Sequence, residues 1–172
     1  MELRRIHANA IPAALERANR YRLLNEPMEA ESICRDILAI DARHQAALKT
    51  LILSLTDQFS RQQREPRDEA ARLLTQLESE YDREYYSGVV AERAAKALIA
   101  SGAAASMSFA RIQTSMDHFK RAIDLAESGN DEAVLRWNAC IRLIERFNLQ
   151  PETQPEAHRF VPEAFDDEVP GR

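Results

Sequence analysis

The sequence has little glycine and no run of residues in which apolar and polar side chains alternate as they do in a β-strand. Only four of its 172 residues are glycine, whereas hydrophobic residues make up 45% and charged residues 30% of the chain. Alanine, leucine, glutamate and arginine are abundant and β-branched residues are few, a composition that favours helices over strands. A chain of this length can bury a sizeable core as one domain. We therefore expect an all-α protein.

The sequence also lacks the signals of membrane, secreted and nucleic-acid-binding proteins. No apolar run approaches the roughly 20 residues that span a bilayer, and Pro12 interrupts the N-terminal stretch in which a signal peptide would need an unbroken apolar core. The formal net charge of −5 excludes the basic field on which nucleic-acid binding usually depends. Cys34 and Cys140 stand far apart with no CxxC pair, which favours buried thiols in a reducing compartment. We expect a cytoplasmic protein with no nucleic-acid partner and no membrane insertion.

Motifs of catalysis and metal binding are absent as well. There is no HExxH sequence, no nucleophile elbow and no phosphate-binding glycine loop. The four histidines, which have no partner at metal-ligand spacing, are His7, His44, His118 and His158. We expect no catalytic residue, no cofactor and no metal. A small helical enzyme or enzyme subunit is the alternative of a different class, and a closed pocket that joins His118 to other titratable groups would favour it.

What the sequence does contain is seven stretches in which apolar residues recur three and four positions apart, the period of an amphipathic helix. The predicted helices begin near residues 9, 27, 44, 66, 82, 104 and 130. The apolar face of the last one is formed by Val134, Trp137, Ile141, Ile144 and Phe147. The residues predicted to mark helix ends are Asn9, Asp82 and Asn130 as N-caps, Pro27 and Pro66 as openers, and Gly102 as a stop.

The C-terminal segment differs in composition from the rest of the chain. From Pro151 onward it carries six acidic residues against two arginines and four of the seven prolines. It also carries three large apolar residues, Phe160, Val161 and Phe165, which a purely solvated linker has little reason to contain. We expect this tail either to bind a partner or to fold back over basic residues of the body. The predicted organisation is an N-terminal extension (1–9), a helical domain (10–149) and an acidic, proline-containing tail (150–172).

The first two predicted helices carry a recognisable spacing. Tyr21 lies late in the first helix, Ala30 follows nine residues on, and Cys34 follows four after that. This hairpin resembles a tetratricopeptide repeat (TPR), and a shift by 34 residues places the first helix on the third. The resemblance spans about residues 11–147, is strongest over 11–44, and departs from the family at Ile52, where a small residue is usual, and at Ala42, where proline is common. The positions that match in the two later, lengthened copies are Leu55, Ala70, Leu74 and Leu77, then Ala95, Leu98, Ser115, Phe119 and Ala122.

The resemblance implies a right-handed solenoid of about three irregular hairpins followed by a capping helix. In TPR proteins the first helix of each hairpin lines a concave groove that binds peptides, and the resemblance implies the same use here. The basic residues Arg22, Lys49 and Lys96 are predicted to pair with acidic groups of a bound peptide; the alternative is that they are solvated surface charges. The implied groove residues are Leu15, Asn19, Arg22, Lys49, Leu53, Thr56, Glu92, Lys96 and Ile99.

Three tyrosines and the single tryptophan are the remaining candidates for contact residues. Tyr81, Tyr85 and Tyr86 crowd one junction, and we expect at least two of them to pack between neighbouring hairpins; Trp137 is expected in the core. The resulting hypothesis is a non-enzymatic adaptor or scaffold that binds a protein or peptide partner. A dedicated chaperone for a secreted or assembled protein is the alternative within the binding class, and homo-oligomerisation is left open.

Overall fold

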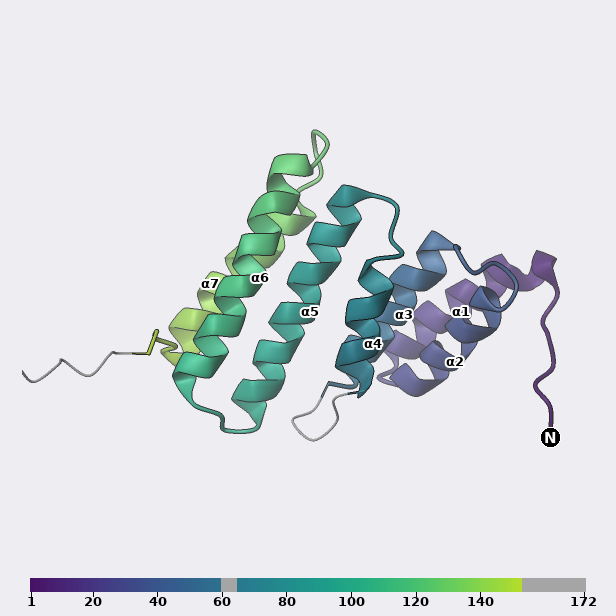
Figure 1. Cartoon of the computed structure of the whole chain (residues 1–172), viewed down its shortest axis with the longest axis horizontal. Coiled ribbons are helices and arrows are strands. Elements are labelled where there is room, and N and C mark those ends of the chain that lie inside the picture. The colour runs from purple at the N-terminus through teal and green to yellow at the C-terminus, as the bar shows by residue number, and fades with distance from the viewer. Residues whose placement is uncertain (60–64, 153–172) are drawn as a thin grey trace, which may run out of the picture.

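The computed structural model describes residues 1–59 and 65–152, and all regular structure in these two ranges is helical (Figure 1). This confirms the predicted all-α class. One short 3-10 helix precedes seven α-helices. They are η1 (Ala8–Ala10), α1 (Ile11–Leu23), α2 (Pro27–Leu38), α3 (Gln45–Asp57), α4 (Glu65–Leu74), α5 (Glu80–Ala100), α6 (Ala105–Leu125) and α7 (Glu132–Phe147).

Several helix ends follow the sequence signals. Pro27 is the first residue of α2 and Pro66 the second of α4, positions where the missing amide hydrogen costs no intrahelical bond. Gly102 has a φ of 68° directly after α5, which is the left-handed conformation that glycine accepts without strain. The prediction of Asn130 as the N-cap of α7 is wrong by one residue, because Asp131 is the N-cap; the side chain of Asn130 nevertheless accepts a hydrogen bond from the amide of Glu132 at 3.2 Å.

Two further predicted N-caps are also wrong. Asn9 lies inside η1, and Ala10 precedes α1 without any side-chain cap. Asp82 lies in the first turn of α5, because Ser79 caps that helix by accepting a hydrogen bond from the amide of Asp82. Ser79 and Asp82 are both residue types that commonly cap helices, and the sequence alone does not show which of them is the N-cap.

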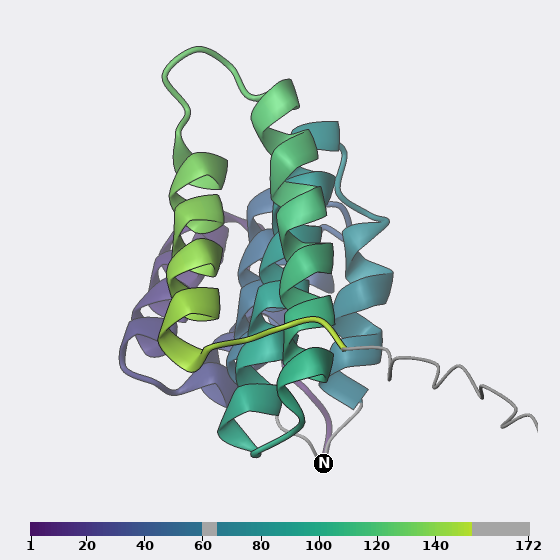
Figure 2. The ribbon, with the colours of Figure 1, turned by 90° about the vertical axis from the view of Figure 1, so that its left-hand side faces the viewer.

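The helices form a stack of hairpins in which each helix packs against the next one along the chain. The odd-numbered helices also contact one another, from α1 to α3, α3 to α5 and α5 to α7. The backbones of the even-numbered helices lie further apart, since no Cα atom of α4 in the described chain lies within 8 Å of a Cα atom of α2 or α6. We call these two sides the odd-helix face and the even-helix face. Figure 2 views the stack from its α6–α7 end.

Two clusters of buried side chains fill the stack, and Tyr86 packs against both of them. The N-terminal core, among α1 to α4, consists of Ala18, Ala30, Cys34, Leu48, Leu51, Ile52, Leu55, Ala70, Leu73 and Leu77. The C-terminal core consists of Tyr85, Val89, Ala95, Ile112, Phe119, Ala122, Ala133, Cys140 and Leu149. Both cysteines are therefore buried and free, as predicted, and burial raises the pKa of the Cys34 thiol to about 12.

A glycine sets the close approach of α5 and α6. An ideal Cβ atom built on Gly88 would lie 2.5 Å from Cε1 of the fully buried Phe119 ring. The hydroxyl of Ser115 donates a hydrogen bond to the carbonyl of Gly88 at 2.8 Å. Because Gly88 has no side chain, the aromatic ring packs directly on the α5 backbone.

The tyrosine junction packs only partly as expected. Tyr85 is buried, with its ring centroid 5.8 Å from that of Tyr81, 5.2 Å from that of Tyr86 and 6.0 Å from that of Phe119. The hydroxyl of Tyr81 also donates to the side-chain oxygen of Asn130 at 3.2 Å. Tyr86, which packs against both cores, lies between neighbouring hairpins, whereas the ring contacts of Tyr85 stay within α5 and α6. The prediction that at least two tyrosines pack between hairpins is thus confirmed for Tyr86 only.

The predicted apolar face of the last helix is only partly covered by other helices. Trp137 packs against the C-terminal core, but Ile141 and Phe147 are 38% and 44% exposed. Only α5 and α6 pack against α7 in the described part of the chain, so one side of its apolar stripe stays uncovered. Periodicity identified an apolar face without showing whether a neighbour covers it.

Candidate binding surfaces

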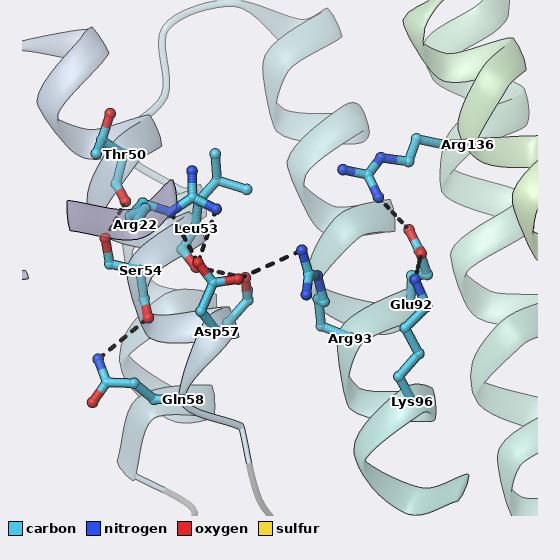
Figure 3. Close-up of polar contacts among 11 residues, drawn as sticks. Arg22, Thr50, Leu53, Ser54, Asp57, Gln58, Glu92, Arg93, Lys96 and Arg136 are labelled. Carbon is cyan, nitrogen blue, oxygen red and sulfur yellow. Dashed lines mark hydrogen bonds and ion pairs between the residues drawn. The ribbon is translucent and has the colours of Figure 1, made fainter. Parts of the chain in front are cut away.

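The odd-helix face carries a row of ion pairs that join successive helices (Figure 3). Asp57, at the end of α3, pairs with Arg22 of α1 at 2.9 Å and with Arg93 of α5 at 3.5 Å. Lys49 of α3 pairs with Asp82 of α5 at 2.6 Å. These carboxylates neutralise two of the three cations that the sequence assigned to peptide binding.

The third cation belongs to a buried cluster. The carboxylate of Glu92 is only 1% exposed, and it pairs with Lys96 one turn further along α5 and with Arg136 of α7 at 3.3 Å (Figure 3). A carboxylate removed from water in this way costs free energy unless cations and hydrogen bonds compensate it. Glu92 therefore ties α5 to α7 and is not available to a ligand.

The other predicted groove residues also make contacts within the protein. The side-chain oxygen of the exposed Asn19 accepts a hydrogen bond from Thr50 at 3.2 Å. Thr56 is buried and donates to the carbonyl of Leu53 at 2.8 Å, while Leu53 and Ile99 pack against the C-terminal core. Leu15 is half-buried. Peptide binding on this face stays a prediction, and each of its three basic residues would have to leave an internal carboxylate to pair with a peptide.

The predicted tail contacts at Phe160, Val161 and Phe165 lie outside the described residues. The same holds for most of the acidic tail, which the structure describes only as far as Glu152.

The even-helix face carries an open groove of about 790 Å³ between α4 and α6, with α5 as its floor. The floor is made by one stripe of α5, Ser87, Ala91, Ala94 and Leu98, together with Val90. Ala91 and Ala94 have small side chains, so a ligand can approach close to the α5 backbone. The opposite walls come from α4 and α6, whose Cα atoms are all more than 8 Å apart in the described chain.

Helix length explains why this groove is open. At about 1.5 Å per residue, α4 is roughly 15 Å long and α5 and α6 are each roughly 31 Å long. The short α4 therefore leaves part of α5 uncovered. Between α2 and α4 the situation differs, because Arg35 pairs with Glu69 at 2.8 Å and bridges those two helices.

The walls of the groove combine apolar and basic side chains. On the α4 side, the guanidinium of Arg67 lies 5.5 Å from the centroid of the Phe59 ring. On the α6 side, Arg111 is exposed and makes no ion pair with any residue in the described ranges. The remaining wall residues are Asp68, Ala71, Leu74, Met107, Ala110, Thr114 and His118. Arg111 is thus a cation beside an apolar floor, and it is free to pair with a ligand carboxylate.

A polar network borders the groove at His118. Glu84 of α5 accepts from His118 at 2.7 Å and from Arg121 at 2.8 Å. Burial alone would raise the pKa of the Glu84 carboxyl, but the hydrogen bonds from His118 and Arg121 outweigh it and lower that pKa. Glu84 is therefore ionised near neutral pH and holds α5 and α6 together.

Sequence reasoning missed this groove because it placed the site on the first helix of each hairpin. A signal was nevertheless present in α5, which has apolar residues on more than one side and therefore must pack against several partners. Those residues include Ala91, Ala94, Ala95 and Leu98. What the sequence does not contain is the distance between α4 and α6, which are separated by a whole helix.

Comparisons of the chain with family models, with curated proteins and with solved structures found no match. In the described ranges, no cluster of three or more histidine, cysteine, aspartate or glutamate side chains is arranged to hold a metal ion. Within those same ranges, no helix is long and apolar enough to cross a membrane.

Proposed function

We propose that this protein is a non-enzymatic interaction module that binds a peptide segment of another protein in the groove between α4 and α6. One observation carries the proposal: an open groove with an apolar floor lies between α4 and α6, whose Cα atoms are all more than 8 Å apart, and Arg111 beside it has no ion-pair partner among the described residues. The ligand that suits this surface is a segment that combines large apolar side chains with acidic ones, because it can fill the floor and pair with Arg111.

We further propose that the three hairpins α1–α2, α3–α4 and α5–α6 are irregular TPR-like repeats in a right-handed solenoid that ends with α7. Burial at the matching positions supports this assignment. Ala30, Ala70 and Ser115, which occupy the same position in the three copies, are fully buried, and Phe119 is fully buried in the third hairpin. The two later repeats are the longer ones, and the groove lies between them.

The open shape of the groove supports binding rather than catalysis. The titratable network nearest to it, Glu84 with His118 and Arg121, lies beside an open surface, and its carboxyl has a lowered pKa. A general acid at neutral pH would need the opposite shift. Adaptor and chaperone roles both use such a surface, and the identity of the bound partner is what distinguishes them.

The expected affinity is modest. Burying a phenylalanine side chain contributes about 1.5–3 kcal/mol, and a charge-assisted hydrogen bond adds about 1.5–3 kcal/mol. Immobilising the peptide offsets much of this gain. We therefore expect dissociation constants on the order of 1–100 μM for short peptides.

Selection of peptides from a random library against the full chain tests the proposal. The groove variant is Ala71→Glu/Ala110→Glu, which places one carboxylate on each wall at an exposed position. The matched control is Ala13→Glu/Ala46→Glu, the same change at exposed positions of α1 and α3. We expect enrichment of peptides with aromatic and acidic residues, and binding that weakens at least about tenfold in the groove variant only.

A second arm examines the odd-helix face. The variant Asn19→Glu/Lys49→Gln changes two of the residues that the sequence assigned to that face and leaves the groove intact. If selected peptides lose affinity for this variant and keep it for the groove variant, the binding site is on the odd-helix face and the assignment to the α4–α6 groove is wrong.

A further inference from the structure

We infer that the groove between α4 and α6 is occupied by the chain's own C-terminal segment, residues 153–172. In this arrangement Phe160, Val161 and Phe165 lie against the α5 floor, and the acidic residues that follow them lie beside Arg111. This inference rests on the proposed function, since it uses the same groove, and it identifies the tail as a competitor of any external peptide.

The course of the chain after α7 directs the tail toward the groove. Asn148 ends α7 in the left-handed conformation with a φ of 45°, and the amide of Leu149 donates to the carbonyl of Ile144 at 3.0 Å. Leu149 is buried in the C-terminal core and fixes the exit point. Figure 2 shows the following residues crossing in front of α6, from the side of α7 toward the side where α4 lies. The described chain therefore ends on the side of the even-helix face.

The length of the tail suits this placement. Phe160 lies eight positions after Glu152, and an extended chain spans up to about 3.3 Å per residue, so the two residues can be up to roughly 26 Å apart. A helix is about 10 Å across, so Phe160 can pass α6 and reach the groove. Pro155 and Pro162 lack a backbone amide hydrogen and disfavour a helix there, which suits an extended ligand.

The charge pattern favours the even-helix face over the odd-helix face. On the odd-helix face, Arg22, Lys49 and Lys96 already have carboxylate partners within the protein. Arg111 has no such partner among the described residues. The tail places Asp166, Asp167 and Glu168 directly after Phe165. A segment with apolar residues followed by acids thus matches a groove with an apolar floor and an unpaired cation on its wall.

The methionine methyl groups provide natural reporters of this contact. Met107 lines the groove and is 55% exposed, whereas Met28 is 68% exposed on α2, outside the groove. We would record methyl spectra of the full chain labelled at methionine, and compare it with the variant Phe160→Ser/Phe165→Ser. The Met107 resonance is expected to move because the variant removes two aromatic rings beside it, and the Met28 resonance is expected to stay in place. An unchanged Met107 resonance would overturn the inference.

A charge-reversal pair adds an independent test. The variant Arg111→Glu is expected to move the Met107 resonance toward its position in the tail variant, and adding Asp166→Arg/Asp167→Arg is expected to restore it. All three positions are exposed or lie in the tail, so these changes leave both cores intact. If the second change restores nothing, the tail does not pair with Arg111.

Failure of this inference and failure of the proposed function give different results. A library-selected peptide is added to the full chain and to the tail variant, with Met107 as the readout. If the Met107 resonance has the same position in the tail variant and the full chain but moves when the peptide is added, only the tail inference is wrong. If Met107 responds to neither, the groove is not a binding site and both proposals are wrong. If both hold, the peptide binds the tail variant more tightly than the full chain, because the competing segment has been weakened.

Discussion

The two halves of the molecule use the same helical hairpin in different ways. In α1 to α4 the helices are 10 to 13 residues long, and aliphatic side chains and alanines dominate the N-terminal core. In α5 and α6 they are 21 residues long, and the C-terminal half buries an aromatic ring against a glycine together with the charged side chain of Glu92. The shorter helices stack regularly. The longer helices α5 and α6 extend beyond the shorter α4, and the groove lies where the two halves of the molecule meet, between α4 and α6.

The halves are nevertheless joined across the boundary. Asp57 pairs with Arg93, Lys49 pairs with Asp82, and Tyr86 packs against both cores. In repeat proteins the stability is close to a sum of unit and interface contributions. The contacts at this boundary therefore decide whether the two halves unfold together.

The largest effect is expected from closing the space at Gly88. Gly88→Val places a branched side chain where a Cβ atom alone lies 2.5 Å from the Phe119 ring, so the ring or a helix must move. We expect a loss of about 3 kcal/mol in the free energy of unfolding, measured by urea denaturation. Hydrogen exchange should show lost protection in α5 and α6 before α1 and α2.

The milder variant Gly88→Ala provides the control for this prediction. At an unconstrained helix position, glycine to alanine stabilises by about 1 kcal/mol. A gain of this size would contradict the close packing of Phe119 on Gly88.

The next largest effect is expected at the buried carboxylate. Glu92→Gln leaves Lys96 and Arg136 beside an uncharged amide in a site that is only 1% exposed, and we expect a loss of about 2 kcal/mol in the free energy of unfolding. Glu78→Gln is the matched control, because its partner Arg43 and Glu78 itself are both exposed, and its loss should stay below about 0.5 kcal/mol. Equal losses in the two variants would show that burial of Glu92 has no energetic role.

A smaller effect is expected at the boundary between the halves. Asp57→Asn removes the charge that joins α1, α3 and α5, and we expect a loss of about 1 kcal/mol in the free energy of unfolding. Trp137 is the only tryptophan and reports the C-terminal half, while far-UV circular dichroism reports the whole molecule. In the variant the two signals should no longer share one midpoint. Coincident midpoints would mean that Tyr86 and the Lys49–Asp82 pair suffice to couple the halves.

The smallest effect is expected from protonating Glu84. Its pKa in the folded protein is lower than in the unfolded chain, so its stabilisation is fully present above the unfolded value and is lost as the pH falls through the folded value. The difference in unfolding free energy between the natural chain and Glu84→Gln should therefore shrink as the pH is lowered below about 4.5. A difference that stays constant with pH would contradict the network with His118 and Arg121.

The fold was largely predictable from the sequence because its signals are local. Pro27, Pro66 and Gly102 mark helix ends through their own backbone chemistry, and the apolar period predicts which face each helix buries. The exposure of Ile141 and Phe147 was not predictable in this way, because the period does not show whether a neighbouring helix covers the apolar face.

The candidate site was less predictable because its determinants are distant in sequence. Lys49 and Asp82 are separated by a whole hairpin, and Asp57 meets Arg22 and Arg93 from two different helices. The sequence shows that these charged residues are present but not which of them form ion pairs. The groove exists because the backbones of α4 and α6 lie apart on either side of α5. This separation is a property of the folded structure and cannot be read from the sequence.

The central claim is that the groove between α4 and α6 binds apolar, acidic segments. The most direct test is fluorescence anisotropy of a labelled peptide with the sequence of residues 156–169, titrated with the full chain carrying Phe160→Ser/Phe165→Ser. We expect saturable binding that weakens at least about tenfold when Ala71→Glu/Ala110→Glu is added and stays unchanged with Ala13→Glu/Ala46→Glu. No saturable binding, or equal weakening by both pairs of changes, would contradict the claim.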